Sequence, residues 1–413
     1  MDNGTATNGY AASPAGFRRL SCLYEALRIR RENPMSIDKA RSTNPFFNDQ
    51  PFKIGLFAYL HQGGMALTKA PERWDGSWDN IETMARMADQ AGMDYLIPIA
   101  NWKGWKGEVV HRRHSFETLT HAAALAGVTK NIGLVATVHA PLVPPIFAAK
   151  ALTTIDHASR GRAALNIVCG WNKADFDAFG VPRLEHDERY EHGLEWYEII
   201  TRILREGGGE DFDYDGKYFR DLKGIAGEPA SLQQPHPAII SAAYSPAGRD
   251  FAIKTSDILM TGIGSVASAA AEIADIRRRE DEAGRTKALT VIGTVWVTCR
   301  ETREEAERFN QYYAVEQADD IAIDAFVGER SANASAPAAD TQRRRFGAAG
   351  GGLIVGTPED LVEQFVELKK AGMDGVALLT LNYVNDLPLI TDRVMPLMEK
   401  AGLRLPSAVA VPA

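Results

Sequence analysis

The sequence predicts an α/β fold, specifically a (β/α)8 TIM barrel with insertions. Eight short apolar, β-branched runs alternate with segments of helical spacing from Phe52 to the C-terminal region. The predicted strands are continuously apolar, as strands are in a parallel sheet covered by helices. No Gly-x-Gly-x-x-Gly follows an early strand, which argues against an open dinucleotide-binding sheet. Eight βα units therefore favour a closed barrel.

The strands are predicted where β-branched and apolar residues concentrate between turn-forming residues. In chain order they cover 52–60, 93–101, 131–139, 162–170, 238–245, 258–263, 289–298 and 375–381.

The helices are predicted from apolar spacing together with start and stop residues. Ser77 occupies an N-cap position and Gly92 an end position. Prolines begin the helix at 144–161, where they are tolerated. The helices cover 77–92, 115–129, 144–161, 189–206, 247–256, 265–284, 358–372 and 385–402, with a hairpin around Asp215-Gly216.

Three segments differ in composition from the barrel, which is predicted at 46–405. Residues 1–45 form an N-terminal extension whose residues are first small and polar and then basic. Met35 is a second candidate for the initiating methionine. A transit peptide is the alternative, which the acidic residues Asp2, Glu25 and Glu32 weaken. Residues 327–352 are rich in Ala, Ser, Gly and Arg and predict a lid-like or disordered insert over the catalytic face. Residues 406–413 form a tail.

Charge and cysteine content exclude several classes of function. The net charge of -8 argues against a nucleic-acid-binding surface. The three cysteines, Cys22, Cys169 and Cys299, form no CxxC pair, which fits a reducing compartment and no structural zinc. No apolar run approaches the roughly 18 residues of a membrane span. We expect a cytoplasmic protein without a membrane or nucleic-acid partner.

The predicted strand ends are rich in aromatic, amide and hydroxyl groups and short of carboxylates. Barrel enzymes place their sites at these C-terminal ends. A glycosidase would need two facing carboxylates, and the first five strand ends offer none. His61 and His139 are isolated, so no metal site is expected. His111 and His114 are interpreted as a polar cap region before a helix.

Flat aromatic rings together with amide and hydroxyl donors suit a planar heteroaromatic cofactor. Ser245 precedes a predicted helix as an N-cap, and free backbone N–H groups there can bind an anion. Arg189 and Tyr190 begin another helix and add a charged and a neutral donor. The three residues together favour a phosphorylated cofactor.

From about Phe52 to Gly402 the chain resembles the bacterial-luciferase-like superfamily of flavin-dependent barrel oxidoreductases. The segments LNIVCGWNKADFDAFG, RLEHDERY and LQQPHP resemble its two-component monooxygenases, among them pyrimidine, dimethyl-sulfone and alkanesulfonate monooxygenases. The extension and the insert at 327–352 lie outside the resemblance.

The resemblance assigns roles to single positions. Ala100 and Asn101 match the strand end that lies against the flavin ring. Thr137 matches a threonine of the oxygen pocket, and Asn166 an asparagine that contacts the flavin beside it. Asp175 stands where pyrimidine monooxygenase has a glutamate that contacts FMN.

Arg189, Tyr190 and Ser245 match phosphate-binding residues. The strand before Ser245 reads SAAYS where the relative has Ala-Gly-Gln-Ser, so its contacts beside the phosphate differ. A weaker set is expected to line the substrate pocket: His61, Trp102, Trp105, His139 and Trp171.

Structural roles remain alternatives for several of these residues. Asn166 could be a buried amide that satisfies loop backbone, and Thr137 a β-branched strand residue with a local hydrogen bond. Trp102 and Trp105 could be rim packing, and His61 a loop histidine.

The resemblance implies a two-component monooxygenase that uses reduced FMN (FMNH2) and O2. Thr137 and Asn166 would be catalytic, and a flavin peroxide would transfer oxygen to a small heterocyclic, organosulfur or haloaromatic compound. A separate NAD(P)H-dependent flavin reductase would supply FMNH2, and a homodimer or homotetramer is usual for relatives. The alternatives are a deazaflavin-dependent oxidoreductase of the same superfamily, a non-catalytic flavin-binding protein and, last, a metal-dependent hydrolase.

The rim, rich in Trp and poor in charge, predicts a small neutral or weakly polar substrate. An alkanesulfonate would need extra cations, which Arg343, Arg344 and Arg345 of the insert could supply.

Overall fold

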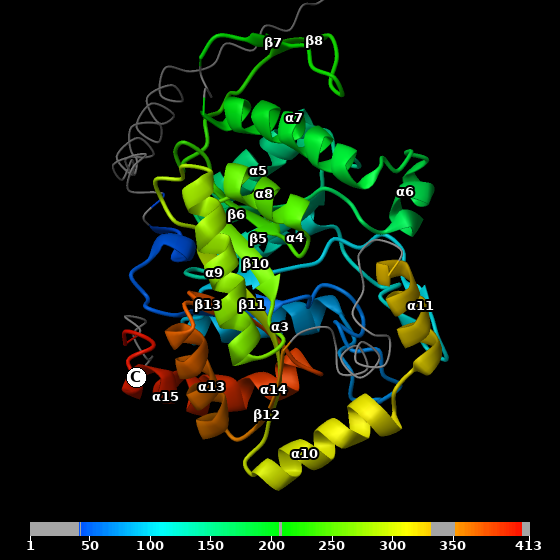
Figure 1. The fold of residues 1–413 in the computed structure, drawn as a ribbon, viewed down its shortest axis with the longest axis vertical. Helices are drawn as coiled ribbons and strands as arrows, with labels where there is room; N and C mark the ends of the chain where they lie inside the picture. The colour runs from blue at the N-terminus through cyan, green and yellow to red at the C-terminus, as the bar shows by residue number, and fades with distance from the viewer. Residues whose placement is uncertain (1–40, 42, 206–208, 332–351, 407–413) are drawn as a thin grey trace, which may run out of the picture.

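The computed structural model describes residue 41 and residues 43–205, 209–331 and 352–406. Its centre is a closed barrel of eight parallel strands (Figure 1), as the sequence predicts. Each strand pairs with its neighbour in the order β1-β2-β5-β6-β9-β10-β11-β13, and β13 pairs back with β1. The strands are β1 Lys53–Phe57, β2 Tyr95–Ile97, β5 Gly133–His139, β6 Ala163–Val168, β9 Ala238–Ala242, β10 Ile258–Gly262, β11 Thr290–Cys299 and β13 Gly375–Leu379.

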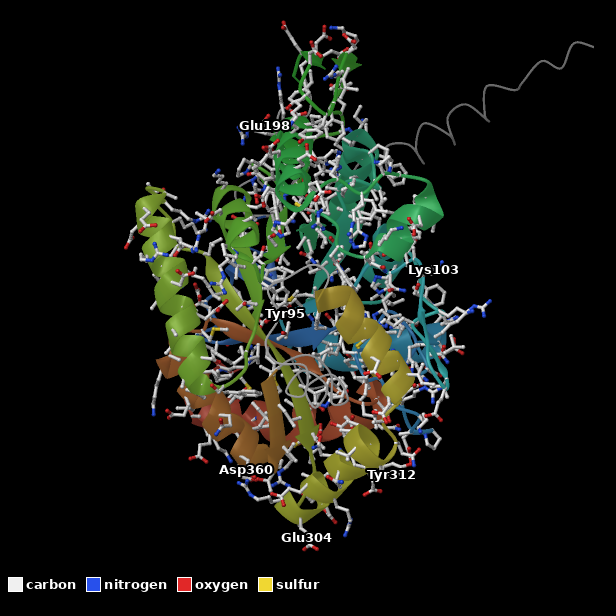
Figure 2. The ribbon with its side chains drawn as sticks, turned by 45° about the vertical axis from the view of Figure 1, so that its right-hand side comes forward. Tyr95, Lys103, Glu198, Glu304, Tyr312 and Asp360 are labelled. Atoms are coloured by element: carbon white, nitrogen blue, oxygen red, sulfur yellow. The ribbon has the colours of Figure 1, made fainter. Side chains whose placement is uncertain are left out.

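Alternate residues of each strand face the barrel interior, because successive side chains of a strand point to opposite faces. Val135 of β5 and Ala164 of β6 belong to the interior apolar cluster, whereas Leu134 and Leu165 pack with the surrounding helices. Tyr95 of β2, also in the interior cluster, lies near the middle of the molecule in Figure 2. Every second residue after Val135 and Ala164 therefore points along the interior toward the C-terminal mouth.

Helices follow the strands and cover the barrel. Helix α13 begins with a capping box formed by Thr357 and Asp360, and Pro358 occupies its first turn. Ser77 is the N-cap of α3 by position, but its side chain makes no capping hydrogen bond. The helices are α3 Trp78–Gln90, α4 Thr118–Ala126, α5 Pro145–Ser159, α7 His186–Arg205, α8 Pro246–Thr255, α9 Val266–Glu282 and α13 Pro358–Lys370.

The last predicted helix, 385–402, is divided in the structure. It begins earlier, as α14 Tyr383–Leu389, widens into the π-helix η3 Ile390–Val394 and continues as α15 Met395–Lys400. Pro388 lies inside α14. Proline lacks an N–H donor, which interrupts the regular hydrogen-bond ladder and accounts for the change of winding.

Insertions extend the βα loops at the C-terminal ends of three strands. β3 Trp105–Lys106 and β4 Val110–His111 form a small hairpin after β2. α6 Lys173–Phe179 follows β6. β7 Phe212–Tyr214 pairs with β8 Leu222–Ile225 around the predicted turn at Asp215-Gly216, but this hairpin lies in the connection from α7 to β9 and not in a βα loop. The segment between β11 and β13 adds α10 Arg303–Gln311, η2 Tyr312–Glu316, α11 Asp320–Ser331 and β12 Gly352–Gly356.

The predicted insert at 327–352 is only partly described. Its first residues continue helix α11 through Ser331, so this part is helical and not a loop. β12 begins at Gly352 and pairs with Val295–Cys299 of β11, outside the closed barrel. The remainder, 332–351, including Arg343, Arg344 and Arg345, lies outside the described residues.

Part of the predicted extension contacts the barrel. Arg41 forms an ion pair with Asp257, and the buried Asn44 donates to the carbonyl of Ala163. Phe46 of the short helix η1 Pro45–Phe47 stacks on Tyr95, with ring centroids 4.9 Å apart. Residues 1–40 and 407–413 lie outside the described residues. None of the helices in the described ranges has the length and apolar character needed to cross a membrane.

Candidate functional site

Thr137 and Asn166 meet at the mouth of the barrel. They are paired in register on β5 and β6, and each stands two residues beyond an interior position. Thr137 Oγ1 donates to the carbonyl of Pro98 over 2.6 Å, and Asn166 Nδ2 donates to Thr137 Oγ1 over 3.2 Å. This chain of hydrogen bonds fixes the orientation of the Asn166 amide.

The Asn166 side chain retains one unused acceptor. Its Oδ1 is buried and has no hydrogen-bond partner in the described structure, although the residue is only 3% exposed. Buried polar atoms are nearly always hydrogen-bonded. The free acceptor therefore fits a ligand that brings an N–H or O–H group to the mouth of the barrel.

The end of β2 is tied to the loops around it. Asn101 Nδ2 donates to the carbonyl of Arg112 over 3.0 Å, and the Asn101 carbonyl accepts from Ser115 Oγ over 2.8 Å. Ala100 is buried beside it. The Asn101 amide thus supports a loop in this structure, while Ala100 leaves an apolar surface at the strand end.

Asp175 and His139 face one another behind the strand ends. Asp175 is in the first turn of α6, and its Oδ1 accepts from the backbone N–H of Trp102 over 3.2 Å. His139 Nδ1 lies 3.9 Å from Asp175 Oδ2, too far for a hydrogen bond. Burial lowers the pKa of His139 to about 4, so the imidazole is neutral at neutral pH.

The sharp turn after β6 depends on Gly170. Its φ of +93° lies in the region that glycine favours, and a Cβ there would stand 2.5 Å from Phe176 of α6. The Gly170 carbonyl accepts from Arg189 Nη1 of α7. The turn thus joins the end of β6 to α6, which carries Asp175, and to α7, which carries Arg189 and Tyr190.

The predicted phosphate residues come together between α7 and α8. The Tyr190 hydroxyl lies 3.2 Å from Ser245 Oγ, and Ser245 Oγ accepts from the N–H of Gly248 over 3.1 Å. Arg189 is buried, and its Nε has no partner among the described residues. An Arg, a Tyr hydroxyl and a helix N-terminus capped by Ser form a suitable site for a phosphate.

Gly248 keeps this site open. A Cβ at this position would stand 2.9 Å from the Tyr190 hydroxyl and 3.2 Å from Ser245 Oγ. We expect Gly248→Ala to weaken reduced FMN binding about 10-fold, the effect of losing one charge-assisted hydrogen bond. Anaerobic fluorescence titration measures this. Gly127→Ala at the end of α4, where a Cβ would lie 3.4 Å from the Ala124 carbonyl, is the matched control. Equal FMN affinity of the two variants would contradict a phosphate site at Gly248.

Helix α11 covers the mouth of the barrel. Ala322, Ile323 and Phe326 belong to the same apolar cluster as the barrel interior. The Phe326 ring meets Trp171 edge-on, with centroids 6.3 Å apart. α11 and α6 lie on the same side of the molecule in Figure 1. Trp171 thus packs beneath α11, where a pocket residue is expected.

His111 fastens α11 to the β3–β4 hairpin, which corrects its interpretation as a helix-cap residue. His111 Nε2 lies 3.0 Å from Asp319 Oδ2, and Asp319 also accepts from the backbone N–H groups of Glu108, Val109 and Ala322. Burial would raise the pKa of Asp319, but these hydrogen bonds outweigh it and hold the pKa at about 2. The cap of α4 is Glu117 instead.

The other expected pocket residues belong to the loops that follow β1 and β2. Trp102 is 42% exposed and packs edge-on against Phe179 of α6, 5.0 Å away, which is rim packing. His61 is fully buried in the loop after β1. The backbone of Trp105 pairs with His111 in the β3–β4 hairpin.

A cleft of about 1130 Å³ lies elsewhere, between α10 and α14, and contains none of the predicted site residues. Arginines and carboxylates alternate along its lining, among them Arg300, Arg393, Glu301 and Asp392. α10 and η2 lie at the lower edge of the molecule, where Figure 2 labels Glu304 and Tyr312. Because this cleft contains none of the residues expected to contact the flavin, the cofactor site is assigned to the strand ends.

A family model described as luciferase-like monooxygenase matches residues 52–375. The chain belongs to the luciferase-like monooxygenase family. It is 29% identical over 371 residues to the FMNH2-dependent dimethylsulfone monooxygenase of Pseudomonas putida, covering 88% of this chain and 99% of that protein. It is 25% identical to the pyrimidine monooxygenase of Enterobacter cloacae subsp. cloacae, covering 84% and 96%.

Among solved structures, a riboflavin lyase crystallised with modified FMN and riboflavin superposes with a TM-score of 0.75. It shares 23% identity, and the match covers 86% of this chain and 92% of that one. This likeness concerns the fold. In a luciferase-like barrel, Asn166 Oδ1 and Arg189 Nε, which have no partner in the part of the chain that the structure describes, and the opening beside Gly248 fit the ring and the phosphate of a flavin nucleotide.

Sequence reasoning missed Arg112, Asp319, Phe326 and Gly248. A signal existed for Gly248, since it stands three residues after Ser245 in the first turn of the predicted helix. Arg112 lies in the HRRH segment, where nothing distinguishes a buried arginine from its exposed neighbour Arg113. Asp319 and Phe326 depend on contacts across some 200 residues of chain, such as that between His111 and Asp319.

Proposed function

We propose that the protein is a two-component monooxygenase that uses reduced FMN and O2 to oxygenate a small organosulfur or heterocyclic compound. The observation that carries the proposal is the hydrogen-bond chain from Asn166 through Thr137 to the Pro98 carbonyl, which leaves Asn166 Oδ1 buried and without a partner among the described residues. Membership of the luciferase-like monooxygenase family supports it. So do the FMNH2-dependent dimethylsulfone monooxygenases and pyrimidine monooxygenases among its relatives.

Bound reduced FMN would supply two electrons, so that one atom of O2 enters the substrate and the other leaves as water. Asn166 Oδ1 can accept a hydrogen bond from an N–H group on the edge of the flavin ring, and the second hydrogen of Nδ2 remains available to oxygen. Thr137 holds the amide in this orientation. Donors fixed before the reaction stabilise developing negative charge without reorganisation.

Two further groups of residues complete the proposed site: those that would bind the FMN phosphate and those that would cover the reacting atoms. Arg189, Tyr190 and Ser245 would bind the phosphate, and Ala100 would leave room against the ring. Phe326 and Trp171 would exclude water from the reacting atoms. His139, neutral because burial lowers its pKa to about 4, and Asp175 would line the same end of the barrel.

The partners follow from the two-component type. A separate NAD(P)H-dependent flavin reductase would deliver reduced FMN by transient contact or diffusion. We also propose a cytoplasmic location and a homodimer or homotetramer.

The test is anaerobic titration of the purified chain with reduced FMN, oxidised FMN and reduced deazaflavin, followed by a pulse of O2. We expect reduced FMN to bind at least 10-fold more tightly than the other two and to give a distinct absorbance change with O2. A preference for deazaflavin would replace oxygenation with hydride transfer. Binding of none of the three would overturn the proposal.

A further inference from the structure

Strands β2 and β5 separate as they approach the mouth of the barrel. In the part of the chain that the structure describes, the two strands pair only as far as Leu96 and Leu134, whereas β5 continues beside β6 to His139. The Pro98 carbonyl points toward β5, because it accepts from Thr137 Oγ1 over 2.6 Å. Proline has no N–H to donate on that side. The backbone ladder between β2 and β5 therefore stops just before the site.

Two threonine hydroxyls hold the end of β5 where the ladder stops. One is the bond from Thr137 Oγ1 to the Pro98 carbonyl, and the other runs from Thr118 Oγ1 to the Thr137 carbonyl over 2.5 Å. Thr118 is the first residue of α4, which packs against β5, and its side chain is buried. Thr137 is thus fixed twice, at its hydroxyl by the segment after β2 and at its carbonyl by α4.

Thr118 is available for this bond because another residue caps α4. Ser and Thr are preferred N-cap residues, yet Glu117 is the N-cap here, and its carboxylate accepts from two N–H groups of the first turn over 2.8 and 2.7 Å. Ser115, two residues before Glu117, donates to the Asn101 carbonyl over 2.8 Å. The two hydroxyl side chains that lead into α4 therefore bond to the segment after β2 and to β5, and not to their own helix.

The position of Thr137 determines that of the Asn166 amide. Asn166 Nδ2 donates to Thr137 Oγ1 over 3.2 Å, and Asn166 Oδ1 has no partner among the described residues. Release of the Thr137 carbonyl would let the Thr137 hydroxyl shift, and the amide would shift with it. A displacement of about 1 Å is enough to weaken the effect of a preorganised group strongly.

We propose that Thr118 is a positioning residue for the site that would bind reduced FMN and O2. Its hydroxyl acts on Thr137 and, through Thr137, on the orientation of the Asn166 amide toward the flavin ring and oxygen. The inference rests on the proposed function, because the orientation of this amide matters only if the site binds a flavin. It adds a residue of a barrel helix to the strand-end residues on which the chemistry depends.

The test replaces Thr118 by valine, which has nearly the same shape but no hydroxyl. The first measurement is the visible circular dichroism of bound FMN at saturation, which reports the surroundings of the ring. The second is an O2 pulse to the protein with reduced FMN and no substrate, in which reduced FMN and O2 give oxidised FMN and H2O2. We expect an altered dichroism spectrum and H2O2 release about 5-fold faster, the effect of one displaced hydrogen bond. Affinity for reduced FMN should stay within about 3-fold, because the phosphate residues are unchanged.

Two variants separate positioning from stability. Thr201→Val removes another buried threonine hydroxyl, which donates to the Tyr197 carbonyl within α7 over 2.7 Å. It should lower the free energy of unfolding in urea as much as Thr118→Val does and leave both flavin measurements unchanged. Thr118→Ser keeps the hydroxyl and should behave as the unmodified protein. Flavin measurements that are the same in Thr118→Val and Thr201→Val, or the same in Thr118→Val and Thr118→Ser, refute the assignment. If Thr118→Val does not fold, Thr118→Ala takes its place in both comparisons.

A double variant tests whether Thr118 acts through Asn166. In the Asn166→Ala background, Thr118→Val should change H2O2 release by less than about 1.5-fold, because residues that act through one another are not additive. A full effect in that background would contradict the inference. The two proposals also fail in different ways. Absence of FMN binding in the unmodified protein would overturn the proposed function, whereas normal FMN binding with no effect of Thr118→Val would overturn the positioning role alone.

Discussion

Replacement of Asn166 by alanine is expected to lower product formation about 10²- to 10³-fold while reduced FMN still binds. The amide would stabilise charge that develops during oxygen transfer, and removal of one such preorganised group costs about 3–4 kcal/mol. FMN affinity should fall much less, because the phosphate residues Arg189, Tyr190 and Ser245 between α7 and α8 are unchanged in this variant. Product yield per NAD(P)H consumed, with anaerobic FMN titration alongside, measures both effects.

Thr137 provides the internal control for this prediction. Thr137→Val removes the hydroxyl that joins Asn166 to the Pro98 carbonyl and should lower product formation in the same direction, whereas Thr137→Ser should retain most of it. Since the two residues act as a unit, the double variant Thr137→Val with Asn166→Ala should lose little more than Asn166→Ala alone. Normal turnover in both single variants would show that the pair is only structural.

The register of β5 and β6 explains why this part of the site could be predicted from sequence. Parallel strands that alternate between interior and exterior place residues at equal depth side by side. Thr137 and Asn166 are therefore neighbours once the strands are assigned. The same pattern predicted all eight barrel strands, because buried parallel strands are continuously apolar.

The cover of the site could not be predicted in the same way. The segment 320–331 has a weak apolar pattern, and its position depends on Asp319 and His111, which are 208 residues apart in sequence. The burial of Arg112 could not be predicted either, because it results from contacts with the loop at 61–65 and with Phe326. Local composition shows only that such loops are polar. Which of their charged side chains is buried can be seen only in the folded chain.

The free energy of unfolding is expected to fall steeply as the pH decreases from about 6.5 to about 4. His121 and His139 are completely buried, and burial lowers their pKa values to about 3 and about 4. Unfolded histidine titrates near 6.5, so in this interval the unfolded chain binds about two more protons than the folded chain. The contribution is fully present above pH 6.5 and is lost on acidification, at about 2.7 kcal/mol per pH unit for two histidines.

Other titrating groups do not reverse this slope. His61 and His111 also have lowered pKa values, mainly through burial, and act in the same direction. Asp319 contributes only below about pH 4, because its pKa is about 2. Burial raises the pKa of Asp386, against the charge of Arg300, and this group alone among those named works in the opposite direction.

Urea unfolding at pH 7.5, 6.5, 5.5 and 4.5 measures the slope, and His121→Gln isolates one histidine. Glutamine keeps an acceptor near the Tyr59 hydroxyl, which lies 3.3 Å from His121 Nε2, but does not titrate. We expect the slope of this variant to be smaller by about 1.4 kcal/mol per pH unit, with His114→Gln, at an exposed histidine, unchanged. An unaltered slope in His121→Gln would mean that His121 is protonated in the folded chain. A smaller slope of the unfolding free energy against pH in His121→Gln would show that acid unfolds the protein by protonating its buried histidines. A fall in enzyme activity below pH 6 would then reflect unfolding and would be no evidence for a catalytic acid or base.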